Sequence, residues 1–250
     1  MYTIRGTGTA DRPHPATAPD TRRPGAAPGP AREQPFGPNA ASILASEHWS
    51  LLGFRSLIWN EAMSRASVFL SVISAAIITL ALLANAAGGS SATSLALVLL
   101  PVVLFLGITT HIRVVQINTV EIEVMLAMNR LRHAYLQIEP GLEPYFTSSH
   151  HDDAPGLAVS FLLPRRAGRL GQWGNFLVST PTVLATVDAA LAAAVVVLAV
   201  RQTDAPATIA LVMAAATFLL VWAALVSWER HTLDPVARTT PRFRTPPDHS

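Results

Sequence analysis

The sequence predicts an all-α polytopic membrane protein with four transmembrane helices, arranged as two hairpins with a long cytoplasmic helical extension. The 250 residues are 50% hydrophobic but only 14% charged, whereas soluble domains carry about 25% charged residues. The mean hydropathy is +0.37. Four apolar segments are each long enough, at about 1.5 Å per residue, to cross a hydrocarbon layer of about 30 Å. These observations exclude an ordinary soluble enzyme and a fully disordered chain.

Residues 1–40 are predicted to form a disordered Pro-rich tail. This segment contains eight prolines and few large apolar residues. It therefore cannot bury enough apolar surface to offset the entropy lost on ordering. No apolar stretch follows its early charges, so we do not expect a secretory signal peptide.

Residues 41–65 are predicted to form an amphipathic interfacial helix that continues into the first span. Leu51, Phe54 and Ile58 repeat at helical spacing, and polar residues occupy the opposite side. Tryptophan rings favour the membrane–water boundary, where the ring is half dry and its N–H can find a partner. On this basis the expected interfacial anchors are Trp49, Trp59, Trp173 and Trp228.

The four spans form a first transmembrane hairpin over 66–110 and a second over 177–228. Within them, residues 66–87, 93–110 and 207–228 contain no charge, and residues 177–200 contain one, Asp188. Cytoplasmic loops carry an excess of basic residues. Here 17 of the 18 basic residues, all arginine, lie before the first span, between the second and third, or after the fourth. We therefore expect a multi-pass cell-membrane protein with both termini in the cytoplasm.

Residues 111–138 are predicted to leave the bilayer as an unbroken cytoplasmic helix. They lack Pro and Gly, and they carry one apolar stripe that would pack on the 41–65 helix or on another subunit: Ile117, Val120, Val124, Met128, Leu131, Tyr135 and Ile138. His111 and Arg113, at its start, are expected to anchor in the headgroup layer. Prolines and glycines mark residues 139–176 as a cytoplasmic loop. Residues 229–250, after the fourth span, are predicted to form a flexible tail.

Asp188 is the candidate ion or proton site because an ionisable residue within a span is costly and usually faces a bundle interior. Two interpretations remain open. The carboxyl binds a proton or a cation, or it makes a structural hydrogen bond between helices, for which Ser71, Ser74 and Thr217 are possible partners.

No catalytic, metal or cofactor site is expected. Cysteine and lysine are absent, which excludes thiolate metal sites, disulfides and lysine-based catalysis. His150, His151, Asp152 and Asp153 are consecutive and rarely converge on one ion, so we expect them to be solvated. No basic stripe interleaved with aromatic residues predicts binding to nucleic acid.

Three stretches resemble an uncharacterised group of actinobacterial four-span integral membrane proteins: Arg55–Glu61 (RSLIWNE), Met128–Tyr135 (MNRLRHAY) and Leu142–Asp153 (LEPYFTSSHHDD). The resemblance covers about residues 47–230. It implies a membrane location but no activity, because the group has none assigned.

The sequence therefore favours a non-enzymatic integral membrane protein, embedded in the lipid bilayer and homo-oligomeric. The leading hypothesis is a channel-like or pore-forming component that uses Asp188. The alternative is a membrane anchor or scaffold that recruits a cytoplasmic protein partner through the 111–138 helix. An enzyme acting on lipid is the least favoured class, because the chain lacks a recognisable set of catalytic residues.

Overall fold

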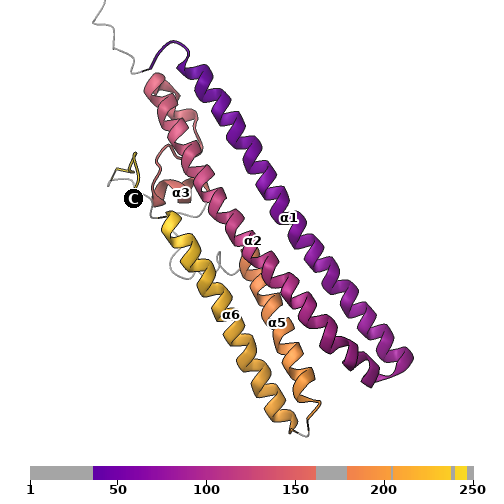
Figure 1. Cartoon of the computed structure of the whole chain (residues 1–250). Helices are drawn as coiled ribbons and strands as arrows, with labels where there is room; N and C mark the ends of the chain where they lie inside the picture. Colours follow the sequence, from indigo (N-terminus) through magenta and orange to yellow (C-terminus); the bar gives the residue numbers. More distant parts are fainter. Residues whose placement is uncertain (1–35, 162–178, 204, 238–239, 247–250) are drawn as a thin grey trace, which may run out of the picture. The chain divides into compact units, whose positions relative to one another are not determined.

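The computed structural model describes residues 36–161, 179–203, 205–237 and 240–246. Within these ranges the chain is 85% helical and contains no strand. The helices, in chain order, are α1 (Ala40–Ala87), α2 (Gly89–Ile138), the short 3-10 helix η1 (Pro140–Tyr145), α3 (Ala154–Ser160), α5 (Thr180–Val200) and α6 (Ala207–Ala237) (Figure 1). Four of them, α1, α2, α5 and α6, are long and apolar enough to cross a membrane, which agrees with the predicted integral membrane protein.

α1 and α2 are each far longer than a single span. α1 has 48 residues and α2 has 50. At about 1.5 Å per residue, each exceeds 70 Å, more than twice the thickness of a hydrocarbon layer. The amphipathic segment 41–65 therefore belongs to the same helix as the first apolar segment. Only Gly88 separates α1 from α2, and its φ of 90° is a left-handed conformation that glycine adopts without a side-chain clash.

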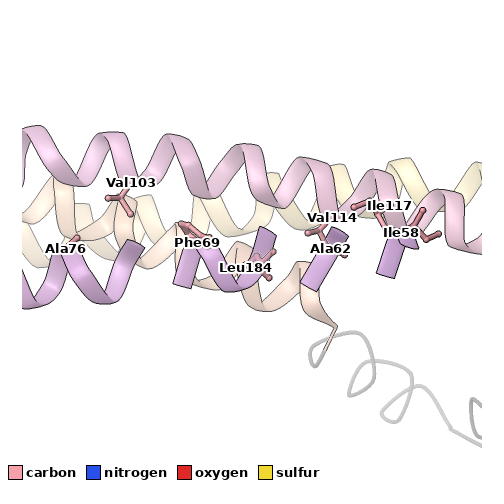
Figure 2. Close-up of a cluster of buried hydrophobic side chains, with 9 residues drawn as sticks. Ile58, Ala62, Phe69, Ala76, Val103, Val114, Ile117 and Leu184 are labelled. Carbon is pink, nitrogen blue, oxygen red and sulfur yellow. The ribbon is translucent and has the colours of Figure 1, made fainter. Parts of the chain in front are cut away.

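The main core lies between α1, α2 and α5. It contains residues from all three helices, labelled in Figure 2: Ile58, Ala62, Phe69, Ala76, Val103, Val114, Ile117 and Leu184. Ala62 and Ala76 let the backbones approach closely, and the larger residues fill the space between them. α5 in turn packs against α6, with Ala185, Ala189 and Ala192 among its buried residues.

A second core covers part of the stripe predicted on 111–138. Val124 and Met128 of α2 pack with Leu157 of α3, and Leu51 and Leu52 of α1 lie against them. Of the two partners expected for this stripe, the structure shows the 41–65 segment of the same chain. α3 also packs against the stripe. Beside this core the helices are joined by ion pairs between Arg55 and Glu121 and between Glu61 and Arg113.

Within the described residues, the segment 229–250, predicted to be a tail, contains the end of α6 and a stretch bound to Asp152 and Asp153. α6 continues to Ala237, well beyond the predicted end of the span at residue 228. Residues 229–234 contain no Gly or Pro that would stop the helix, and Glu229 is buried against α5. Further on, residues 242–245 are held by hydrogen bonds from their backbone to Asp152 and Asp153.

Candidate functional site

Asp188 lies at a point where three helices meet. Its side chain is 0% exposed, on the face of α5 that also buries Leu184, Ala185 and Ala189. Gly107 of α2 lies directly opposite. A Cβ atom built on Gly107 would overlap Asp188 Oδ1 and the edge of the Phe69 ring from α1. The carboxyl group therefore fits only because α2 has no side chain at position 107.

Neither carboxyl oxygen of Asp188 has a hydrogen-bond partner among the described residues. The Ser71 and Ser74 hydroxyls, two of the possible partners, instead donate to carbonyl oxygens of their own helix, at 2.8 and 2.9 Å. Thr217, the third possible partner, makes no hydrogen bond to Asp188 within the described residues either. The structural interpretation, a hydrogen bond between helices, thus has no support within the described residues.

A second group of buried polar residues surrounds the first turn of α5. Ser179 caps this helix, and its Oγ lies 2.9 Å from Thr182 Oγ1. Thr182 Oγ1 in turn lies 3.4 Å from Oε2 of Glu229 in α6. Glu229 is only 1% exposed. Glu229 directly follows the last apolar residue of the fourth span, so the sequence alone does not distinguish it from an exposed charge at the start of the tail.

His111 joins the same region from α2. Its Nδ1 lies 3.0 Å from the carbonyl oxygen of Pro181, and its ring centroid lies 6.1 Å from that of Trp228. The ring is fully buried, so the expected anchoring of His111 in the headgroup layer is wrong. Pro181 lies in the first turn of α5, where a helix needs no backbone donor, so this proline does not break the helix.

The tryptophans predicted as interfacial anchors differ in their positions. Trp49 and Trp59 are 74% and 51% exposed, and both lie on α1. They are ten residues apart in one helix, and therefore about 15 Å apart along its axis. If α1 crosses the membrane surface at a right angle, the two rings lie at different depths. Trp228 is partly exposed near the end of the fourth apolar segment. Trp173 lies outside the described residues.

Asp152 and Asp153 hold the segment 242–245. Asp152 accepts hydrogen bonds from Arg130 Nε at 2.6 Å and from the backbone amides of Arg242 and Phe243 at 3.1 and 2.7 Å. Asp153 accepts from the amide and hydroxyl of Thr245 and from the amide of Gly156. The prediction of solvation is therefore wrong for Asp152, which is buried, whereas Asp153 is half-buried and also hydrogen-bonds the backbone.

These contacts change the proton affinity of Asp152. Burial acts to raise the pKa of this carboxyl, but the hydrogen bonds from Arg130 and from the two amides outweigh it and hold the pKa below its usual range. Next to this cluster lies a cavity of about 480 Å³, lined in part by Phe146, His150, His151 and Thr245. No group of three or more His, Asp or Glu side chains is arranged to hold a metal ion within the described ranges.

The arrangement therefore offers two buried polar centres, one at Asp188 and one at Glu229, and a third cluster that holds a chain segment. No family model, curated protein or solved structure matches this chain.

Proposed function

We propose that this chain is a proton-conducting, channel-like component of the cell membrane, non-enzymatic and homo-oligomeric, with Asp188 as its intramembrane proton site. The observation that supports this most is the isolation of the Asp188 carboxyl group. It is fully buried in an apolar segment, and neither oxygen is hydrogen-bonded within the described residues. An ionisable residue placed there costs about 2.5–3.5 kcal/mol on insertion scales, and such residues typically serve ion or proton pathways.

A proton suits this site better than a metal cation. Hard cations such as Ca²⁺ take about six to eight oxygen ligands. Next to Gly107, the Asp188 carboxyl group lies beside the Phe69 ring, and neither of its oxygens has a hydrogen-bonding neighbour within the described residues that could complete a set of cation ligands. A proton needs only the carboxyl group itself, because a carboxyl oxygen binds it without further ligands.

The proposal also includes a topology. The two pairs of spans, α1 with α2 and α5 with α6, form hairpins, and both termini lie in the cytoplasm. The distribution of arginine supports this orientation. The segments 40–65 and 111–138 then project together into the cytoplasm. Four spans do not enclose a wide pore, so several copies would assemble. Exposed apolar side chains of α6, such as Leu211, Val212 and Leu220, are available for contact with lipid or with another copy.

The proposal is tested by proton flux into liposomes that contain the purified protein and a pH-sensitive dye. Asp188→Asn keeps the size of the side chain but cannot exchange a proton. We expect a proton flux for the wild type that this variant reduces at least about tenfold, because a positioned proton-transfer group typically contributes about 10²–10⁴-fold to a rate. Glu61→Gln, which changes an acid on the surface of α1, is the matched control and should leave the flux unchanged.

A wild-type flux that equals that of protein-free liposomes, under applied potentials of both signs, would contradict a constitutively conducting state. A flux that Asp188→Asn leaves intact would contradict the role of Asp188. Circular dichroism and size-exclusion profiles of both variants separate these outcomes from a loss of folding.

A second candidate function is a membrane anchor or scaffold, and one observation favours it. The outer side of α1 exposes large apolar residues beyond the apolar span, including Ile43, Trp49 and Leu57. By contrast, Ile117, Val124 and Met128 on the 111–138 stripe are buried within the chain. A partner would therefore bind α1 rather than the 111–138 helix.

The anchor function is tested with the substitutions Trp49→Ser and Leu57→Ser in one chain. The double variant should fold as the wild type does, because both side chains are exposed, but it should lose a partner that crosslinks to wild-type protein in its native membrane. Retention of the same crosslinked partner would contradict binding through α1.

A further inference from the structure

Ser179, Thr182 and Glu229 form a connected line from the protein surface to a buried acid. Ser179 is half-buried at the start of α5, whereas Thr182 and Glu229 are each 1% exposed. The oxygen atoms are 2.9 Å apart between Ser179 and Thr182 and 3.4 Å apart between Thr182 and Glu229. Hydroxyl groups can both donate and accept a hydrogen bond, so a line of them can pass a proton.

The hydrogen bonds along this line share one direction. The Ser179 hydroxyl donates to Thr182 Oγ1, and the Thr182 hydroxyl donates to Glu229 Oε2. The Ser179 hydroxyl also lies close enough to hydrogen-bond Glu229 directly, in a weaker contact than that of Thr182. Thr182 is held in place by the first turn of α5, where its backbone amide donates to Ser179 Oγ. Two fixed hydroxyls that both point at a buried carboxylate are arranged to deliver a proton to it.

We propose that Ser179, Thr182 and Glu229 form a proton relay in which Glu229 is a second buried proton site, loaded from solvent through the two hydroxyls. This inference rests on the proposed function, since Glu229 would supply Asp188. Asp188 follows Thr182 on the buried face of the same helix, six residues or about 9 Å further along. Among the described residues, His111 of α2 contacts Pro181 in this turn, and Arg230, the next residue of α6, interacts with the charge of Glu229.

The proton balance of the relay is simple. Hydronium at the surface gives a proton to Ser179 Oγ, the Ser179 hydroxyl proton moves to Thr182 Oγ1, and the Thr182 hydroxyl proton moves to Glu229 Oε2. One O–H bond breaks and one forms at each step. The net result is a neutral Glu229 carboxylic acid and one water molecule outside. Both hydroxyls must then rotate back before the next proton enters.

The relay predicts a slower arrival of protons at Glu229 when the Thr182 hydroxyl is removed. Thr182→Val keeps the shape of the side chain but cannot pass a proton. The readout is the C=O stretching band of protonated Glu229, identified by its loss in Glu229→Gln and followed by infrared spectroscopy after a downward pH jump on the full-length protein in liposomes. We expect the band to rise at least about tenfold more slowly in Thr182→Val, with an unchanged final amplitude at the same pH.

Thr186→Val is the matched control because Thr186 lies one turn along α5 and its hydroxyl donates to the Thr182 carbonyl oxygen, outside the relay. It should leave the rate unchanged. Equal rates for Thr182→Val and the wild type, or an equal slowing by Thr186→Val, would overturn the relay.

The infrared measurement does not depend on proton flux, so the two proposals fail separately. If the relay is right and Asp188 conducts nothing, the Glu229 band is still slowed by Thr182→Val while the liposomes show no flux. If Asp188 conducts without the relay, flux persists and the band rises at the wild-type rate in Thr182→Val. A protein in which Glu229 never gains a C=O band as the pH falls also overturns the relay.

Discussion

At the scale of single residues, the contact between Gly107 and Asp188 sets how closely α2 and α5 approach. Any side chain at position 107 would meet Asp188 Oδ1 and the Phe69 ring. Phe69 is itself fully buried, so it has little freedom to move aside. A glycine in the interior of a helix lowers the helix propensity, and here that loss is offset by the space it leaves for two side chains.

We expect Gly107→Ala to destabilise the protein by about 1–3 kcal/mol, as overpacking a buried contact does. Thermal unfolding in detergent, followed by circular dichroism, measures this loss. Gly53→Ala is the matched control because Gly53 lies in α1 with no atom within 4 Å of a new Cβ atom. That variant should be neutral or slightly stabilising, since alanine favours a helix.

Adding Asp188→Ala to Gly107→Ala should recover part of the stability, because it removes one of the two groups that the new methyl group meets. Additive effects of the two substitutions would contradict the contact between these residues.

Asp152 gives the second prediction at this scale. Its pKa is lower in the folded protein than the usual value of an aspartate, so its contribution to stability is complete above about pH 4 and is lost as the pH falls through the folded pKa. We expect the protection of the Phe243 amide from hydrogen exchange, relative to intrinsic exchange rates, to fall over that acidic range.

Asp152→Asn should lower this protection at neutral pH by about tenfold or more, because a charge-assisted hydrogen bond contributes about 1.5–3 kcal/mol. It should also remove the dependence on pH below 4. Glu123→Gln, on α2, serves as the control. Full protection of the Phe243 amide in Asp152→Asn at neutral pH would show that Asp152 does not hold this segment.

At the scale of helices, α1 and α2 pack together far beyond the length of one span. The contacts that join them include two ion pairs of different exposure. The Glu121 side chain is 13% exposed in its pair with Arg55, whereas both members of the pair between Glu61 and Arg113 are a third or more exposed. Because solvent and salt screen exposed charges, the pair with Glu121 should bind α1 to α2 more strongly.

A double-mutant cycle on Arg55→Gln and Glu121→Gln should give a coupling energy of about 0.2–1 kcal/mol that changes little between low and high salt. The same cycle on Arg113→Gln and Glu61→Gln should give a smaller coupling that salt abolishes. Chemical unfolding of the four variants of each cycle provides the values. A larger coupling for the pair with Glu61 would contradict this order.

At the scale of the whole molecule, the chain has no cysteine, so single cysteines can be placed without removing any others. The proposed topology predicts that Ser91→Cys and Thr203→Cys react with a membrane-impermeant maleimide added to whole cells. Thr147→Cys should react only after the cells are opened. Labelling of Thr147→Cys in intact cells would reverse or discard the topology.

The sequence allowed the helical class and the apolar segments to be predicted, because each depends on residues close together in the chain. Charge-free runs such as 66–87 and the unbroken pattern of 111–138 fix helix formation locally. Asp188 could also be singled out, since one acid among apolar residues is visible in the letters alone. The burial of Glu229 could not be predicted, because it depends on how α6 packs against α5.

The amino-acid sequence alone therefore indicates which segments are helical, which are apolar, and where their charges lie. The tertiary structure decided which of these segments meet. It left Asp188 without Ser71 or Ser74 as partners, placed Gly107 opposite its carboxyl group, buried Glu229 beside Thr182, and used Asp152 to hold the chain near its C-terminus. Local composition controls secondary structure and burial, but a contact between residues distant in sequence depends on the relative rotation and depth of whole helices, which no short stretch of sequence encodes.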